Sequence, residues 1–337
     1  MNIKILSRQN VEQVLNLSEV ISSVKNVYCK KTEGQAVTWP TLFYDFEHGK
    51  ADMDIKSGYI KGVEVYGSKT VSWFGNNTDL NLPALNGLIT VFDGKTGMPI
   101  GLVEGSYITG MRTGAAGAIG AQLLARPESE NLMILGAGNQ AVFQIGATLT
   151  LIPKIKTVRV ADVISFDNAN RFVESITEKL SKQFGIDASK VKFEAVADLK
   201  EAVSCSDIII TVTPSYEPLI KKEWVKPGTH FSCIGSDMEG KEEIDPEIFK
   251  DARIFNDDIK QCIEVGETEI PIKSGVISAS HIAGEIGDIL AGKTIGRSDN
   301  EQITIFDSTG IALQDLAVAK IALDRANINN IGTDVQL

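Results

Sequence analysis

The chain of 337 residues lacks several features that mark special classes of protein. Its longest apolar runs, such as the three isoleucines at 208–210, fall far short of the roughly 18 residues that a membrane-spanning helix needs. The first residues contain no apolar stretch of about 7–15 residues, so they do not resemble a signal peptide. Only 4 cysteines occur, with no C-x-x-C pair, which indicates reduced thiols and predicts a cytoplasmic protein.

Basic residues and histidines are also scarce. The sequence holds 33 Lys and Arg against 44 Asp and Glu, a formal net charge of −11, and contains no run of five basic residues. Because nucleic-acid affinity depends largely on neutralised phosphates, this balance argues against nucleic acid as a partner. No two of the 3 histidines have the spacing that places two ligands on one helix face, so we expect no metal.

The length suggests about two domains, and the pattern of residues changes along the chain accordingly. Residues 36–106 contain short runs rich in Val, Ile, Tyr and Thr, broken by turn residues such as Asp93-Gly94, which predicts a mostly antiparallel sheet. Beyond the polar connector at 126–130, strands alternate with helices. This alternation predicts an α/β protein whose second domain has a doubly wound parallel sheet.

The individual elements follow from apolar runs and helical spacing. The first 35 residues predict a short strand followed by one helix, and residues 110–126, dense in Ala and Gly, predict a tightly packed helix. Further helices are expected at 166–184 and 311–327. The strands of the parallel sheet are expected at 132–135, 157–161, 192–196, 207–213, 229–234, 252–256 and 303–306.

A glycine-rich turn is the strongest local signal. Gly136 and Gly138 belong to a G-x-G-x-x-A pattern that follows an apolar strand and opens a helix. Gly136 permits the tight turn, Gly138 lets the backbone approach a pyrophosphate, and the small Ala141 lets the helix pack closely on the strand. Free N–H groups at the helix start then face the phosphates. The alternative is a glycine turn that binds no ligand.

Asp162 ends the second strand of this region, 24 residues after Gly138. A carboxylate at that point accepts hydrogen bonds from the ribose hydroxyls of NAD, whereas it repels the 2′-phosphate of NADP. No Arg follows before Arg171, so the sequence predicts NAD, with NADP less favoured. The alternative is an ordinary solvent-facing aspartate at a strand end.

Eight segments together resemble the ornithine cyclodeaminase/mu-crystallin family, in family order and over about residues 55–325. They are residues 67–72 (GSKTVS), 76–77 (NN), 82–85 (LPAL), 93–99 (DGKTGMP), 109–116 (TGMRTGAA), 136–141 (GAGNQA), 234–237 (IGSD) and 307–310 (DSTG). The resemblance implies a Rossmann-type NAD-binding domain at 127–309. It also implies an α+β domain at 1–126, completed by a C-terminal helix at 310–337, which binds substrate and forms a homodimer.

The resemblance also implies roles for single residues. Lys69 and Arg112 match positions that contact the substrate carboxylate and the cofactor. Asp237 matches the catalytic carboxylate that transfers protons, and Lys69 is also expected to be a catalytic residue. Their structural alternatives are a snorkelling lysine, a helix-capping arginine and a loop-capping aspartate. Thr309 and Gly310 match a substrate-side loop. The remaining cofactor positions are Thr113, Gly136, Gly138, Asn139, Gln140, Asp162, Thr211, Thr213 and Ser236.

One departure from the family pattern concerns a further cation. Many members carry an arginine after a pair of prolines before the sheet, but the corresponding stretch here, residues 38–41 (TWPT), has none. Lys56, a few residues on, is the candidate replacement, and the missing arginine weakens ornithine as the substrate.

Three functions compete. The leading one is an NAD-dependent imino-acid reductase or amino-acid dehydrogenase, such as an alanine dehydrogenase or ketimine reductase, which transfers hydride at the Cα of a small 2-amino or 2-imino acid. The second is ornithine cyclodeaminase, which forms proline and ammonia and returns the hydride to the substrate. The third is a crystallin-like protein that binds nicotinamide cofactor without turnover.

Overall fold

The computed structural model describes residues 2–336, which divide into two units. Unit 1 contains the chain up to Arg112 and again from Ile311 onward, and unit 2 contains Thr113–Gly310. The predicted boundary at residues 126 and 127 lies just after helix α3 (Gly105–Leu124), whereas the division found here falls inside that helix. The chain returns to unit 1 at Ile311, close to the start of the predicted C-terminal helix at 310–337. No helix among residues 2–336 combines the length and apolar character that crossing a membrane requires.

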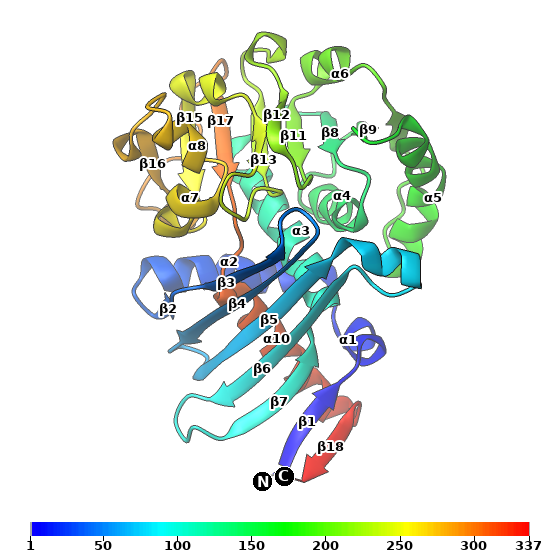
Figure 1. The fold of residues 1–337 in the computed structure, drawn as a ribbon, viewed down its shortest axis with the longest axis vertical. Coiled ribbons are helices and arrows are strands. Elements are labelled where there is room, and N and C mark those ends of the chain that lie inside the picture. Colours follow the sequence, from blue (N-terminus) through cyan, green and yellow to red (C-terminus); the bar gives the residue numbers. More distant parts are fainter. Residues whose placement is uncertain (1, 337) are drawn as a thin grey trace. The chain divides into compact units, whose positions relative to one another are not determined.

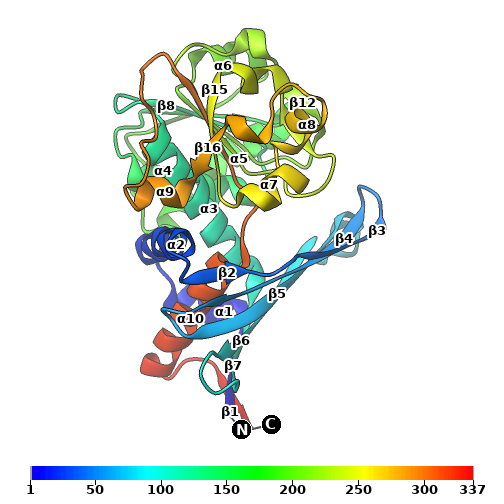
Figure 2. The same ribbon diagram turned by 90° about the vertical axis from the view of Figure 1, so that its left-hand side faces the viewer.

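Unit 1 is built on an eight-stranded sheet (Figures 1 and 2). Its neighbours pair antiparallel except β1 with β7, so the predicted antiparallel sheet is confirmed. In spatial order the strands are β18 (Thr333–Gln336), β1 (Asn2–Leu6), β7 (Pro99–Glu104), β6 (Leu85–Asp93), β5 (Val65–Phe74), β4 (Ala51–Ile60) and β2 (Ala36–Thr38), with β3 (Leu42–Glu47) also paired to β4.

Helix α10 (Ala312–Asn329) packs along one face of this sheet, against β4, β5 and β6 (Figure 2). Close packing depends on small residues in the strands: a Cβ on Gly67 would lie 2.9 Å from Leu316 of α10. The N-terminal region holds two helices, α1 (Arg8–Val14) and α2 (Leu17–Thr32), where one was predicted. The side chain of Asn16 caps α2 by accepting from the Glu19 N–H, which starts a new helix there.

Unit 2 contains the predicted doubly wound sheet, with every neighbouring pair of strands parallel. In order the strands are β10 (Lys192–Ala195), β9 (Thr157–Ala161), β8 (Asn131–Leu135), β11 (Ile208–Thr211), β13 (His230–Cys233), β17 (Ile303–Asp307), β15 (Ala252–Asn256) and β16 (Ile282–Glu285). The order reverses direction between β8 and β11, the switch point beside which such sheets bind ligands. All four residues of β11 and of β13 are buried, as expected for strands covered on both faces.

The connections of unit 2 are mostly helical. Besides α3, the helices are α4 (Asn139–Leu151), α5 (Phe166–Phe184), α6 (Leu199–Cys205), α7 (Ile259–Val265), α8 (Glu269–Lys273) and α9 (Ile286–Leu290). Strands β12 (Tyr216–Ile220) and β14 (Glu242–Ile244) form a small separate parallel pair. Short 3-10 turns lie at Gly75–Leu80 in unit 1 and at Lys222–Trp224, Pro246–Asp251 and Ala279–His281 in unit 2.

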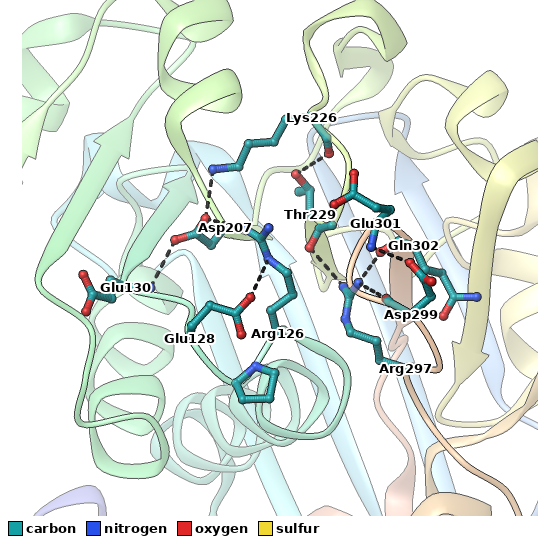
Figure 3. Close-up of polar contacts among 12 residues, drawn as sticks. Arg126, Glu128, Glu130, Asp207, Lys226, Thr229, Arg297, Asp299, Glu301 and Gln302 are labelled. Atoms are coloured by element: carbon teal, nitrogen blue, oxygen red, sulfur yellow. Dashed lines mark hydrogen bonds and ion pairs between the residues drawn. The ribbon is translucent and has the colours of Figure 1, made fainter.

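The N-terminal edge of the parallel sheet is held by a polar cluster (Figure 3). Asp207, just before β11, accepts hydrogen bonds from Arg126 Nη2 at 2.8 Å and from Lys226 Nζ at 2.9 Å. Its second oxygen accepts the backbone N–H groups of Glu130 and Asn131 at the start of β8. Asp207 therefore ties three segments together at the edge opposite the carboxyl ends of the strands, where sheets of this type bind ligands.

Candidate functional site

The glycine-rich turn of unit 2 has the geometry of an anion-binding loop. Gly136 has a φ of +112°, and a Cβ there would lie 2.9 Å from the Val212 carbonyl oxygen, so this position requires glycine. Gly138 is the N-cap of α4, has no side chain to cap the helix, and has open space where a Cβ would stand. The first turn of α4, with Asn139 and Gln140, therefore has backbone N–H groups that could hold an anion such as a phosphate.

Asp162 lies directly beside this turn. Its Oδ2 accepts the Ala137 N–H at 3.2 Å, and its Oδ1 accepts the N–H groups of Ile164 and Ser165 at 3.1 Å each. Arg171 donates to Asn168 Oδ1 at 2.6 Å and to the Asp167 carbonyl oxygen at 3.3 Å, and Asn168 in turn donates to Asp162 Oδ1 at 3.3 Å. Because a fixed carboxylate follows β9 beside the glycine turn, these residues fit the ribose and pyrophosphate of a dinucleotide.

The hydroxyl groups of three predicted cofactor residues donate hydrogen bonds to other groups of the protein. Thr211 and Thr213 donate to Glu243 at 2.6 and 2.8 Å, and Ser236 donates to the Lys241 carbonyl oxygen at 2.9 Å. Glu243, fully buried, also accepts the N–H groups of Thr213 and Gly235. Burial raises the pKa of Glu243, although these hydrogen bonds oppose the rise. One side chain thus joins the loops that follow β11 and β13.

The other predicted residues of unit 2 differ in their exposure to solvent and in their hydrogen-bond partners. Asp237 lies in the loop after β13, where its side chain is 42% exposed and pairs with Lys241 at 2.6 Å. Thr113 is buried, its hydroxyl has no hydrogen bond to any described residue, and its carbonyl accepts from Gln144. Gly310 donates its N–H to Asp257 at 2.8 Å, and Thr309 accepts from Gln261 at 2.7 Å, so buried polar groups order the loop after β17.

In unit 1, Lys69 and Arg112 lie together around a buried carboxylate, Asp315 of α10. Lys69 Nζ is 3.1 Å from Asp315 Oδ2, and Arg112 Nε is 3.2 Å from Asp315 Oδ1. Lys69 is 1% exposed, and burial followed by the charge of Arg112 lowers its pKa to about 8. Lys69 is thus neither a snorkelling lysine nor a surface residue, and its environment suits an anion-binding group.

Lys56 joins this cluster through the pairing of the strands. It lies directly opposite Lys69 across β4 and β5, so the two side chains share a face of the sheet, and Lys56 is 5% exposed. Asp54 lies on the same face, two residues earlier, and one of its oxygens has no hydrogen bond to a described residue. Unit 1 therefore buries three cations at one place.

The acidic and amide partners of these residues were not found by sequence reasoning. Asp315 and Gln314 lie in the apolar N-terminal half of α10, and Glu243 belongs to no recognisable motif. The sequence signal that could have revealed Asp315 is a charged residue inside an apolar run. The same signal marks Asp307 at the end of β17, and both aspartates are fully buried. Across the described part of the chain, no three His, Cys, Asp or Glu side chains are grouped so as to hold a metal ion.

Comparison with known proteins gives consistent matches over the whole chain. The sequence model of the ornithine cyclodeaminase/mu-crystallin family matches residues 1–330. An alanine dehydrogenase of Archaeoglobus fulgidus is 36% identical over 332 residues, covering 98% of each chain. An uncharacterized cyclodeaminase of Sinorhizobium fredii is 31% identical over 336 residues, again covering 98% of each.

Solved structures agree in fold. An archaeal alanine dehydrogenase dimer with bound NAD superposes with a TM-score of 0.91 at 34% identity, covering 100% of both chains. A Δ1-pyrroline-2-carboxylate reductase of Thermococcus litoralis, in complex with NADH and L-proline, has a TM-score of 0.91 at 32% identity and covers 99% of this chain and 100% of that one. The Rossmann-type fold predicted for the second domain is therefore confirmed.

Proposed function

Because the chain belongs to the ornithine cyclodeaminase/mu-crystallin family, we propose that it is an NAD-dependent imino-acid reductase or amino-acid dehydrogenase. It transfers hydride to or from the Cα of a small 2-amino or 2-imino acid. Its relatives include an alanine dehydrogenase and a Δ1-pyrroline-2-carboxylate reductase, whose substrates share a carboxylate beside a carbon bonded to nitrogen.

The observation that carries the proposal is the glycine-rich turn of unit 2 together with Asp162. The turn has open space beside Gly138 and leads into a helix start that has no side-chain cap. The Asp162 carboxylate is hydrogen-bonded to the turn, and this arrangement fits a dinucleotide. When bound, NAD supplies the hydride acceptor or donor. The negative charge of Asp162 favours NAD over NADP, because a 2′-phosphate about 5 Å away is repelled by roughly 3 kcal/mol per unit charge at an effective dielectric near 20.

The residues of unit 1 bind the amino acid in this proposal. Lys69 and Arg112 supply charge-assisted hydrogen bonds to the substrate carboxylate, and the buried Lys56 supplies a third positive charge, in place of the arginine that many family members carry. Thr309 and Gly310 contribute to the substrate side from the loop after β17. Asp237 accepts and returns a proton at the substrate nitrogen or at water, and its exposure to solvent supports that exchange.

A homodimer is the expected assembly. Strand β3 exposes large apolar side chains, with Leu42 at 54%, Tyr44 at 57% and Phe46 at 54%. A patch of this kind is usually covered by a partner, and the archaeal alanine dehydrogenase is described as a dimer. Sedimentation of wild type and of a Tyr44→Ser/Phe46→Ser variant tests this, because only loss of the dimer in the variant agrees with assembly through β3.

The test of the reaction is a spectrophotometric assay with a panel of substrates. Purified protein with NADH is given pyruvate plus ammonia or cyclic imines, and with NAD is given the matching amino acids. Consumption or formation of NADH in proportion to product supports the proposal. Absence of turnover on the whole panel contradicts it and favours a crystallin-like binding protein.

The second candidate is cyclodeamination, which the uncharacterized cyclodeaminase relative favours. Ornithine would then give proline and ammonia without net change in NADH. The same assay separates the two, because ammonia release with constant absorbance of NADH excludes a net dehydrogenase reaction.

A further inference from the structure

Asp315 is the one carboxylate, among the described residues, that contacts both Lys69 and Arg112. It lies in the first turn of α10 and is fully buried. Both cations converge on one oxygen: Oδ1 accepts from Lys69 Nζ and from Arg112 Nε at 3.2 Å each. Oδ2 lies 3.1 Å from Lys69 Nζ. Two cations that would repel each other are thereby held at fixed places around one anion.

The charges that face Lys69 come from every element packed against it. Arg112 of α3 and Lys56 of β4 disfavour its ammonium form, whereas Asp315 of α10 and Asp54 of β4 favour it, and Thr109 of α3 offers a hydroxyl at 3.4 Å. With three cations and two carboxylates, the cluster keeps a surplus positive charge. Asp315 is the carboxylate in direct contact, so it carries most of the compensation.

Helix α10 also orients the guanidinium of Arg112. Asp315 accepts from Nε, and Gln314 accepts from Nη1 at 3.4 Å. Gln314 is itself held by the hydroxyl of Tyr28, to which its Nε2 donates at 2.7 Å. Arg112 Nη2 makes no hydrogen bond within residues 2–336, so this nitrogen remains for a ligand.

We propose that Asp315 is a positioning residue for amino-acid binding, which keeps Lys69 charged and Arg112 oriented so that both donate to the substrate carboxylate. Asp315 does not contact the substrate itself. The inference rests on the proposed function, because that function supplies the carboxylate. It adds a residue 246 positions away from Lys69 in sequence.

The first test is the pH dependence of kcat/KM for Asp315→Asn. Without the carboxylate, Lys69 loses its proton at lower pH, so the alkaline limb should move down by at least about one pH unit. KM for the amino or imino acid should rise at least about tenfold at neutral pH, and KM should change more than kcat. Asp315→Glu, which keeps the charge, should restore the alkaline limb.

Asp324→Asn is the matched control. Asp324 lies on the same helix and also pairs with a lysine, Lys320, but its side chain is 54% exposed. This variant should leave both KM and the alkaline limb unchanged. An Asp315→Asn enzyme with a wild-type alkaline limb would overturn the positioning role. If Asp315→Asn does not fold, Asp315→Glu must still raise KM at least about fivefold by displacing the two cations, and an unchanged KM overturns the inference.

A second measurement separates failure of this inference from failure of the proposed function. Lysine labelled with 13C at Cε allows the titration of Lys69 to be followed by NMR, with Lys69→Arg identifying its signal. A downward shift of the Lys69 titration in Asp315→Asn, in a protein that turns over no amino or imino acid, would refute the function and keep the charge coupling. An unshifted titration refutes the role of Asp315 whatever the activity.

Discussion

Replacement of Asp207 by asparagine should destabilise unit 2 in a manner that depends on pH. Burial alone would raise the pKa of Asp207, but hydrogen bonds from Lys226, Asn131 and the Glu130 N–H outweigh it and hold the pKa at about 2. The ordinary value is 3.8, so the ionised carboxylate stabilises the folded state by about 2.4 kcal/mol at most. Screening at the partly exposed Lys226 lowers this to about 1–2 kcal/mol.

The direction of this pH dependence follows from the difference in the pKa of Asp207 between the folded and the unfolded chain. Because the pKa is lower in the folded state, the unfolded chain binds the proton first as the pH falls. The contribution is complete above about pH 5 and is lost between about pH 4 and pH 2. Asp207→Asn should therefore lower the free energy of unfolding by about 1–2 kcal/mol at pH 7, and the difference from wild type should shrink as the pH approaches 2.

The assay is urea denaturation at several pH values in a Trp39→Phe/Trp73→Phe background, so that the fluorescence reports Trp224 of unit 2. Asp251→Asn is the control: Asp251 pairs with Lys222 at 2.8 Å, but its side chain is 70% exposed, so no measurable loss is expected. A loss for Asp207→Asn that is the same at pH 3 as at pH 7 would refute the electrostatic reasoning. So would an equal loss in the control.

Three further predictions concern the site. Asp237→Asn should lower kcat at least about 100-fold while the Kd of NAD stays within about twofold, and Glu239→Gln, in the same loop and paired with Lys273, should change neither. Arg112→Ala should weaken substrate binding by about 2–5 kcal/mol, whereas analogues without a carboxylate should lose little, which inhibition constants will measure. Wild type should prefer NAD to NADP by about 100-fold in kcat/KM, and Asp162→Ser should narrow this ratio. A wild-type preference for NADPH would refute that reading of Asp162.

Much of unit 2 could be predicted from the sequence because its signals are local. Apolar runs of four or five residues become strands that are buried on both faces, and the helices between them have their own caps, such as Ser165 for α5. The glycine turn was equally readable, since Gly136 adopts a backbone conformation that other residues resist. The separation into two helices near Asn16 was missed, because both segments share one apolar spacing.

The residues of the candidate site were likewise predictable only in part. Lys69 and Arg112 were recognisable as cations in apolar or small-residue surroundings, because burying a charge is costly unless it has a use or a partner. Lys56 was recognisable only as a replacement for the arginine that the family pattern leads one to expect. Their partner was not recognisable, because Asp315 is brought to Lys69 only when α10 packs on β5. In unit 2 the sequence likewise marked Thr211 and Thr213, but their binding to Glu243 depends on β14 lying beside the ends of β11 and β13.

The sequence by itself therefore determined most of the order of strands and helices, the glycine-rich turn, and the types of residue available for chemistry. These depend on periodicity and on backbone preferences within about ten residues of chain. Only the tertiary structure decided which carboxylate neutralises which cation and which hydroxyls are already hydrogen-bonded. Those pairings join residues 30 to 246 positions apart, and their strength depends on burial and on distances of about 3 Å that exist only once the units have folded.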